Sequence, residues 1–257
     1  MLSTPTATPT TGRAARERRF HDEVFSRDRR RWVRAFYGLT RASKARFHER
    51  VAAAAPADLL EIGCGPQSSA IAAARRGCRA HAIDISPVAV ERARAAAQDA
   101  GVEISAHVMD AHALAFASNR FDVVCGMGIL HHLDLARALP EIARVLRPDG
   151  QAIFFEPLAH NPAIRVFRRL TPHLRSADEA PLTRAVVESF GAHFERVHPE
   201  FFHLATLACL PLLPLGGASR WIDRADALDR RLFARLPAAR WWAWTVVLVL
   251  EGPRRTV

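Results

Sequence analysis

The sequence predicts an α/β protein built on a doubly wound, mostly parallel sheet. Five short apolar runs, each typical of a buried strand, occur in order at 58–62, 79–83, 103–108, 121–125 and 151–156. Helix-like segments lie between them at about 68–77, 87–100 and 134–146. Strands that alternate with helices of this length indicate parallel strand–helix–strand units with helices on both faces of one sheet.

The N-terminal part of the chain precedes this alternating region. The polar residues 1–17 have no apolar core, so we expect a disordered tail and not a signal peptide. Apolar residues then recur at helical spacing and predict an N-terminal helical cap over 18–55. Residues 56–257 remain for the main domain, a length that can bury a sizeable core.

The C-terminal part departs from the alternation. Strand-like runs at 193–202 and 244–252 flank a helical, apolar insertion at 203–240. A second insertion at 158–191 is dense in polar groups. Both insertions follow strands of the predicted sheet, so we expect them on the side of the domain that receives an acceptor.

The net charge of +10 is concentrated near the N-terminus. Residues 1–50 hold thirteen basic and five acidic side chains, and Lys44 is the only lysine of the whole chain. Basic segments bind nucleic acids or anionic membranes. Here the arginines alternate with acids and with aromatics at helical spacing, which favours a solvated helix face, so we expect no nucleic-acid partner.

The cysteines and the apolar runs bear on the compartment. The four cysteines show no CxxC pair, which favours reduced thiols and a cytoplasmic protein. The longest apolar stretch, 201–217, is interrupted by His203, Pro211 and Pro214. It is too short and too broken to span a bilayer, so we expect at most peripheral contact with a membrane.

The stretch "LLEIGCGP" contains a glycine turn directly after the first strand. Ligands of doubly wound sheets bind at the carboxyl ends of the strands. Gly63 and Gly65 permit a tight turn there and a close approach of backbone to a ligand. Asp84 ends the next strand, where a carboxylate can accept hydrogen bonds from ribose hydroxyls. Ser68 stands where the dinucleotide fingerprint requires its third glycine, so a nicotinamide dinucleotide fits poorly.

Two further acids indicate a different ligand. Asp110 ends the third strand, where it can accept from the exocyclic amine of adenine, and Glu61 precedes the turn, where it would repel a diphosphate. A ligand with a ribose, an adenine and a cationic centre but no phosphate fits these acids. S-adenosylmethionine is such a ligand. A solvated strand end is the alternative for any one acid, but three in the correct order make coincidence a weak explanation.

The motifs "LLEIGCGP", "AHAIDISPVAVERAR", "VMDAHAL", "FDVVCGMGILHHL" and "ARVLRPDGQAIFFEP" resemble, in order, those of class I S-adenosylmethionine-dependent methyltransferases. The flanking sequence is similar to a bacterial small-molecule branch of that family. The resemblance implies a Rossmann-like sheet of seven strands, the last antiparallel and beside the sixth, and S-adenosylmethionine as cofactor.

The expected cofactor-binding residues lie at four successive strand ends, and they are Glu61, Gly63, Gly65, Asp84, Ile85, Asp110, Ala111 and Met127. One position departs from the family pattern. Gln67 stands near the place where the family commonly has a third glycine, and a side chain there narrows the methionine end of the site.

The loop "GMGILHHLD" follows the fourth strand, where the methyl group should emerge. Histidine is the usual general base for a hydroxyl acceptor near neutral pH. We therefore take His131, His132 and Glu156 as candidate catalytic residues. The alternative is structural, with one histidine capping the next helix, the other packing on the core, and Glu156 anchoring the polar insertion.

Candidate acceptor-binding residues are Tyr37 of the cap and His160 and Asn161 after the fifth strand. A metal site formed by His131, His132, Glu156 and His160 matches no known ligand spacing, so we expect no metal. The apolar stretch 201–217 hints at a hydrophobic acceptor such as a lipid, quinone or polyketide, with core packing as the alternative.

Three functions remain open. The first is a methyltransferase that acts on a small molecule, with oxygen as the expected acceptor atom. The second is a non-catalytic cofactor-binding or scaffold protein, in which Gln67 has ruined the site. The third is a nucleic-acid methyltransferase, against which the sequence lacks an "NPPY"-like tetrapeptide after the fourth strand. The sequence indicates neither the acceptor nor the oligomeric state.

Overall fold

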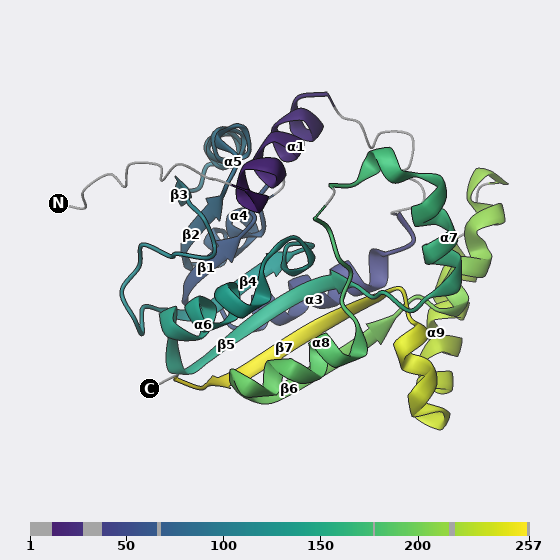
Figure 1. Ribbon diagram of the computed structural model, residues 1–257. Coiled ribbons are helices and arrows are strands. Elements are labelled where there is room, and N and C mark those ends of the chain that lie inside the picture. The colour runs from purple at the N-terminus through teal and green to yellow at the C-terminus, as the bar shows by residue number, and fades with distance from the viewer. Residues whose placement is uncertain (1–11, 28–37, 66–67, 177, 216–218, 256–257) are drawn as a thin grey trace.

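A computed structural model describes residues 12–27, 38–65, 68–176, 178–215 and 219–255. Its centre is one seven-stranded sheet with the order β3-β2-β1-β4-β5-β7-β6 (Figure 1). The strands are β1 Asp58–Ile62, β2 Arg79–Asp84, β3 Ser105–Val108, β4 Phe121–Met127, β5 Leu146–Pro157, β6 Phe194–Phe202 and β7 Thr245–Pro253. The first five strands are parallel, and β7 runs antiparallel between β5 and β6.

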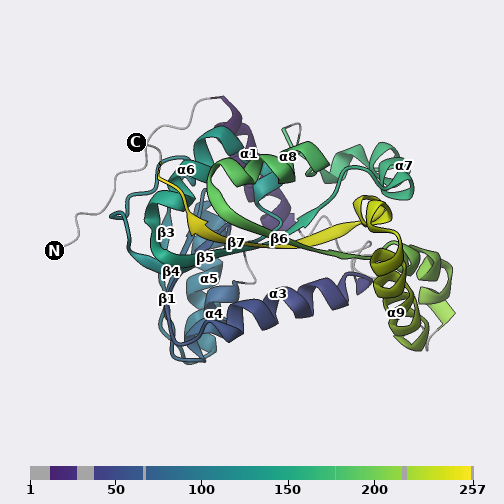
Figure 2. The ribbon, with the colours of Figure 1, turned by 90° about the horizontal axis from the view of Figure 1, so that it is seen from below.

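Helices cover both faces of the sheet. They are α1 Arg13–Arg27, α3 Arg41–Ala53, α4 Ser69–Ala74, α5 Pro87–Asp99, α6 Leu135–Val145, α7 Pro162–Leu170, α8 Arg184–Ser189 and α9 Ser219–Arg235. One core joins α3, α4 and α5 to one face, and the other core joins α6 and α8 to the opposite face (Figure 2). The Rossmann-like class predicted from the sequence is confirmed, including the antiparallel last strand.

The sequence marks the start of most of these helices. Five helices begin at side-chain caps in which an oxygen accepts a backbone N–H of the first turn, from Ser68, Ser86, Asp134, Asn161 and Thr183. Such a cap satisfies one of the four N–H groups that a helix start leaves without a partner. Four of these caps lie in the loops that follow β1, β2, β4 and β5, so they also fix where the helix after each of these strands begins.

Several boundaries differ from the sequence-based expectation. Helix α1 begins at Arg13, inside the stretch expected to be tail, and residues 1–11 lie outside the described residues. Strand β5 begins at Leu146, earlier than the run at 151–156, and its pairing with β4 shifts from Phe121–Leu146 to Val123–Gln151, so "RPDG" forms a bulge between the two parts. None of the described helices is both long and apolar enough to cross a membrane.

A buried polar cluster holds the insertion at 203–240 against α3. The Ser43 hydroxyl lies 2.8 Å from His203 Nε2, and His203 Nδ1 lies 3.3 Å from the Asp226 carboxylate. Asp229 accepts backbone N–H groups of Leu204 and Ala205 at 2.9 and 2.7 Å. A serine, a histidine and an aspartate in this order suggest hydrolytic chemistry. Ser43 and His203 are completely buried, however, so no substrate can reach them. We therefore assign the cluster a structural role, in which its polar contacts hold α3 and α9 together.

An ionic cluster joins the amino-terminal ends of the parallel strands. Asp58 is buried and is held by Arg79 at 2.6 Å, Arg120 at 3.0 Å and Arg147 at 3.0 Å. These guanidinium groups, Arg79 first, hold the pKa of the Asp58 carboxyl far below its usual range. The cluster ties β1, β2, β4 and β5 together at the end remote from the expected ligand site.

Replacing Asp58 with asparagine should destabilise the fold by about 1–3 kcal/mol at neutral pH, because three guanidinium groups lose a charged acceptor. A carboxyl whose pKa falls on folding stabilises the protein above its unfolded pKa, about 3.9, and loses that contribution as the pH falls below this value. Denaturant unfolding of both proteins from pH 7 to pH 2 should therefore show the difference shrinking below about pH 4. A constant difference across this range would contradict the assignment.

Candidate functional site

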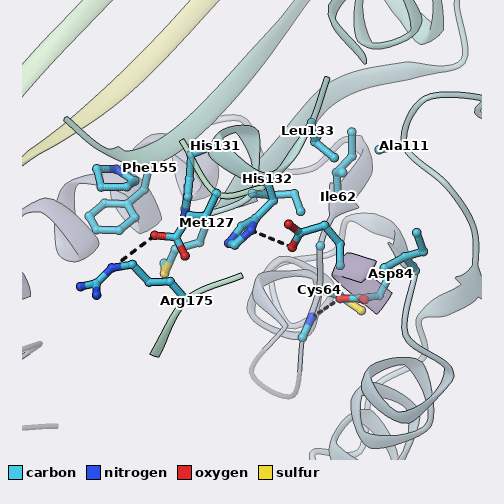
Figure 3. A pocket seen from close by; sticks show the side chains of 18 of the residues that line it. Ile62, Cys64, Asp84, Ala111, Met127, His131, His132, Leu133, Phe155 and Arg175 are labelled. Atoms are coloured by element: carbon cyan, nitrogen blue, oxygen red, sulfur yellow. Dashed lines mark hydrogen bonds and ion pairs between the residues drawn. The ribbon is translucent and has the colours of Figure 1, made fainter. Parts of the chain in front are cut away.

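A cavity of about 510 Å³ opens at the carboxyl ends of the parallel strands. Its wall includes residues from the ends of β1, β2, β3 and β4, from α1 and α3, and from the insertion that follows β5. Asp84 and Cys64 lie at one end in Figure 3, Phe155 and Arg175 at the other, with His131, His132 and Met127 between them. The cavity is thus one space that joins the expected cofactor residues to the expected catalytic histidines.

The glycine turn after β1 forms the floor near the cofactor residues. Gly63 has a φ of +71°, and a Cβ on it would lie 2.8 Å from the Ile129 side chain. Glu61 is buried just before the turn and accepts the N–H groups of Ser69 and Ala70 at 2.8 and 3.0 Å. Burial raises the pKa of Glu61. Its carboxylate therefore fixes the start of α4, and any contact with a cofactor amine would share oxygens already in use.

Asp84 occupies the end of β2, as predicted for a ribose acceptor. One oxygen accepts the Gly65 N–H at 3.0 Å, and the other accepts the Ser86 N–H at 2.9 Å. Ser86 also donates to Asp22 of α1. The aspartate therefore holds the glycine turn in place while it lines the cavity.

Asp110, at the adenine end, is paired with a histidine that the sequence analysis did not single out. His112 Nε2 accepts the Asp134 N–H at 2.9 Å, so its Nδ1 carries the proton and donates to Asp110 at 2.6 Å. This hydrogen bond lowers the pKa of Asp110. Ile85, Ala111 and Met127 line the same cavity, as expected.

His131 lines the cavity and is held from behind by a buried carboxylate. Glu156 is completely buried and accepts the Ile129 and Leu130 N–H groups at 2.9 and 2.7 Å. Its second oxygen lies 2.6 Å from His131 Nδ1. The carboxylate accepts, so Nδ1 donates, and the proton-accepting nitrogen of neutral His131 is Nε2.

His132 is paired in the same manner with the N-terminal helix. Its Nδ1 lies 3.0 Å from Glu17, a buried residue of α1, and Arg13 donates to the His132 carbonyl at 3.1 Å. Glu17 also accepts the Ser176 hydroxyl at 2.5 Å. Helix α1 thus closes the cavity by contacts to both the histidine loop and the insertion after β5.

Glu179, from that insertion, faces the two histidines. One ligand atom from each of His131, His132 and Glu179 lies within 4.8 Å of the others, a spacing that could hold a metal ion. Burial raises the pKa of Glu179, but the histidines and Arg168 outweigh it and leave it lowered. Arg168 and Arg175 both pair with Oε1 of this carboxylate.

Two candidates from the sequence, His160 and Asn161, lie apart from this arrangement. His160 is exposed and accepts the Arg184 N–H at 3.1 Å. Asn161 is buried, caps α7 and donates to the Trp242 carbonyl at 2.7 Å. Tyr37 and Gln67 lie outside the described residues. Glu156 does not line the cavity, and its side chain contacts His131, which does.

The two insertions contribute unequally to the cavity. Residues 158–191 supply Ile164, Phe167, Arg168, Leu174, Arg175 and Glu179 to its wall. Among the described residues that line the cavity, none comes from 203–240. That segment packs instead on Leu39 and Trp244 in a separate apolar cluster. Its apolarity therefore belongs to core packing, the alternative that the sequence left open.

Comparison with known proteins agrees with this geometry. Residues 60–154 match the family model described as a methyltransferase domain. A ubiquinone biosynthesis O-methyltransferase of Alkalilimnicola ehrlichii is 35% identical over 111 residues, which are 42% of this chain and 44% of that relative. The matched region thus spans less than half of that relative.

Solved structures show the same fold at low identity. The N-methyltransferase NodS of Bradyrhizobium japonicum, in complex with S-adenosylhomocysteine, aligns with a TM-score of 0.55 and 16% identity over 84% of this chain and 88% of NodS. A geranyl diphosphate C-methyltransferase of Streptomyces coelicolor aligns with a TM-score of 0.54 and 16% identity over 76% of this chain and 72% of that protein.

The fold, the ordered strand-end residues and the matched model define a class. Residues 60–154 match a methyltransferase domain, and they lie within the seven-stranded sheet of the order β3-β2-β1-β4-β5-β7-β6. S-adenosylmethionine, the cofactor expected from the sequence, fits the residues present: carboxylates lie at the ends of β1 and β2 and just after β3, and Gly63 and Gly65 have the positive φ that favours glycine in a tight turn.

If Asp84 accepts the ribose hydroxyls, Asp84→Asn should weaken S-adenosylhomocysteine binding by about 1.5–3 kcal/mol, roughly 10- to 150-fold, because a charged acceptor is lost. Calorimetry should show this loss, and NAD should give no binding heat with either protein. A thermal unfolding curve close to that of the parent controls for damage to the glycine turn. Equal affinity of the two proteins would contradict the role.

Proposed function

We propose that the protein is an S-adenosylmethionine-dependent methyltransferase that acts on a small-molecule acceptor, with oxygen as the acceptor atom. The observation that carries the proposal is the single cavity, in which the cofactor residues of β1 to β4 meet a histidine held by a buried carboxylate. Side chains of α1 and of the insertion after β5 line this cavity, and its volume of about 510 Å³ is in the range of small-molecule sites.

S-adenosylmethionine supplies a methyl group bonded to a positively charged sulfur. The role of this chain is to align an acceptor oxygen with that methyl carbon and to exclude water, and alignment alone can contribute much of the rate. Met127, Phe155 and Trp244 give the cavity apolar walls. As the new carbon–oxygen bond forms and the carbon–sulfur bond breaks, His131 Nε2 takes the hydroxyl proton.

The pairing of His131 with Glu156 supports the choice of base. Because Nδ1 donates to the carboxylate, the ring is held in the tautomer whose Nε2 can accept a proton, and the resulting imidazolium lies beside a negative charge. Glu156 is therefore a positioning residue. The relatives named above are O-, N- and C-methyltransferases, so they do not decide the acceptor atom. The choice of oxygen is supported by the histidine base, because a hydroxyl acceptor has the greatest need to lose a proton.

His132 serves a different role in this proposal. Its pairing with Glu17 links the loop after β4 to α1, so it holds the cavity closed and does not transfer a proton. Removing it should leave the buried Glu17 without that partner. The alternative of a non-catalytic binding protein predicts cofactor affinity without any methyl transfer.

His131→Ala should lower the rate of methyl transfer by roughly 10²- to 10⁴-fold, the usual contribution of a positioned general base. The affinity for S-adenosylhomocysteine should stay nearly unchanged, because all the expected cofactor residues except Met127 lie at the ends of β1, β2 and β3. The measurement is transfer from methyl-labelled S-adenosylmethionine into the small-molecule and macromolecular fractions of a cell extract, followed by calorimetry of each variant.

The matched variant is His132→Ala, which should mainly reduce thermal stability. Loss of both rate and cofactor affinity in His131→Ala would make the loop structural and remove the base. Label that accumulates in protein or nucleic acid would replace the small-molecule proposal. Absence of label in every fraction, with the cofactor still bound, would favour the non-catalytic protein.

A further inference from the structure

The single lysine of this chain occupies an unusual place. Lys44 lies on α3, three residues before Phe47 and seven before Val51, both buried in the core between α3 and the sheet. This spacing puts it on the core-facing side of the helix. Lys44 is half-buried and lines the cavity. All the remaining Lys or Arg positions of the chain are arginine. Lys44 is therefore a lysine at the position of α3 that faces both the core and the cavity, which suggests a specific role.

The charge of Lys44 has no carboxylate to offset it among the described residues. Burial lowers the pKa of its ammonium group, and no acid raises it again. The other cations of α3 behave differently, since Arg46 and Arg50 both pair with Glu200. A desolvated charge without a counter-charge is costly, so the fold maintains this ammonium at a price in stability.

An unsatisfied hydroxyl lies on the same face of the same sheet end. Thr245 is 2% exposed and lines the cavity, and its Oγ1 has no hydrogen-bond partner among the described residues. It pairs across the sheet with Pro157, and Val247 pairs with Phe155. Phe155 and Val247 belong to the core that α3 covers, so the alternation along β7 turns Thr245 toward α3 as well.

This end of the cavity is remote from the cofactor residues. Strand β7 is three positions from β1 in the sheet, about 14 Å at the usual strand spacing. Phe155, the neighbour of this face, lies at the end of the cavity opposite Asp84 and Cys64 (Figure 3). Ile164, Phe167 and Trp244 add apolar side chains to the cavity wall.

We infer that Lys44 and Thr245 form an anion-binding subsite for the acceptor, which is an apolar or aromatic molecule that carries a carboxylate or a similar acidic group. The ammonium supplies the counter-charge and the hydroxyl donates a hydrogen bond, so an acidic group there would compensate both. Anion binding by Lys44 and Thr245 does not depend on the proposed function, whereas the statement that the anion belongs to a methyl acceptor rests on it. The cofactor also carries a carboxylate, and the test separates the two sources.

The test uses 2-naphthoate and its neutral isostere 2-naphthamide, titrated by calorimetry into the full-length protein with and without S-adenosylhomocysteine. The parent should bind naphthoate at least 10-fold more tightly than naphthamide. Lys44→Met should abolish this preference, and Thr245→Val should reduce it by roughly 3- to 10-fold. Arg41→Met is the matched control, because Arg41 is an exposed cation on the same helix outside the cavity wall, and it should leave the preference intact.

Two further readouts decide the source of the anion and the integrity of the fold. Lys44→Met should bind S-adenosylhomocysteine within about 3-fold of the parent, and a loss above 10-fold would assign the lysine to the cofactor carboxylate and overturn the acceptor subsite. Both Lys44→Met and Thr245→Val should unfold at or above the parent temperature, since each removes an uncompensated polar group. Equal binding of naphthoate and naphthamide to the parent would also overturn the inference.

These measurements separate this inference from the proposed function. If the parent fails to bind S-adenosylhomocysteine but still prefers naphthoate through Lys44, the anion subsite stands and the methyltransferase does not. If it binds S-adenosylhomocysteine and transfers methyl groups but shows no preference for the anion, the subsite fails alone.

Discussion

The site depends on one buried carboxylate at the end of β5. Glu156 has no exposure to solvent, and a charge in that position is tolerated because its oxygens accept two backbone N–H groups and one imidazole N–H. These three hydrogen bonds hold the turn after β4 against the neighbouring strand. The turn in turn sets Ile129 against Gly63, so the glycine floor and the histidine loop are fixed by the same contact.

The insertion after β5 is attached to this point by backbone hydrogen bonds. Ala180 donates to the His131 carbonyl at 2.8 Å, and Leu182 donates to the Pro157 carbonyl at 3.0 Å. The wall that carries Arg168, Arg175 and Glu179 is therefore set relative to the histidines by main chain. Helix α1 adds Glu17 and Arg13 from the other side, and the cavity is enclosed by segments far apart in sequence.

The sequence alone predicted the features that follow from local order. Strands alternating with helices gave the sheet, and acids at successive strand ends gave the cofactor side, because each strand end of a parallel sheet faces the same edge. The pairing of His132 with Glu17 joins residues 115 positions apart, and no local pattern reveals such a contact. Glu179 was missed for the same reason, whereas His112 pairs with Asp110 only two residues away and its role depends on the acceptor bond from Asp134.

The errors of emphasis have a physical cause as well. His160 and Asn161 are polar residues beside a strand end, as ligand-binding residues are, but Asn161 is consumed by the cap of α7 and His160 by the first turn of α8. Glu156 is a carboxylic acid at a strand end, as catalytic acids often are. It is nevertheless completely buried and accepts three hydrogen bonds, which hold the loop after β4 and the His131 ring. Composition at a strand end identifies candidates, whereas the partners of each side chain decide between cofactor, catalysis and scaffold.

The distribution of charge along the cavity suits the chemistry proposed for it. Asp84 lies at the cofactor end and Arg175 at the opposite end (Figure 3), where Glu179 pairs with Arg168 and Arg175. In the proposed reaction His131 takes the hydroxyl proton while the methyl group leaves the sulfonium, so one positive charge passes from the sulfur to the imidazole. The ring that receives this charge already donates a hydrogen bond to the buried Glu156 carboxylate. A negative group that is fixed before the reaction stabilises the developing imidazolium without reorganisation of solvent.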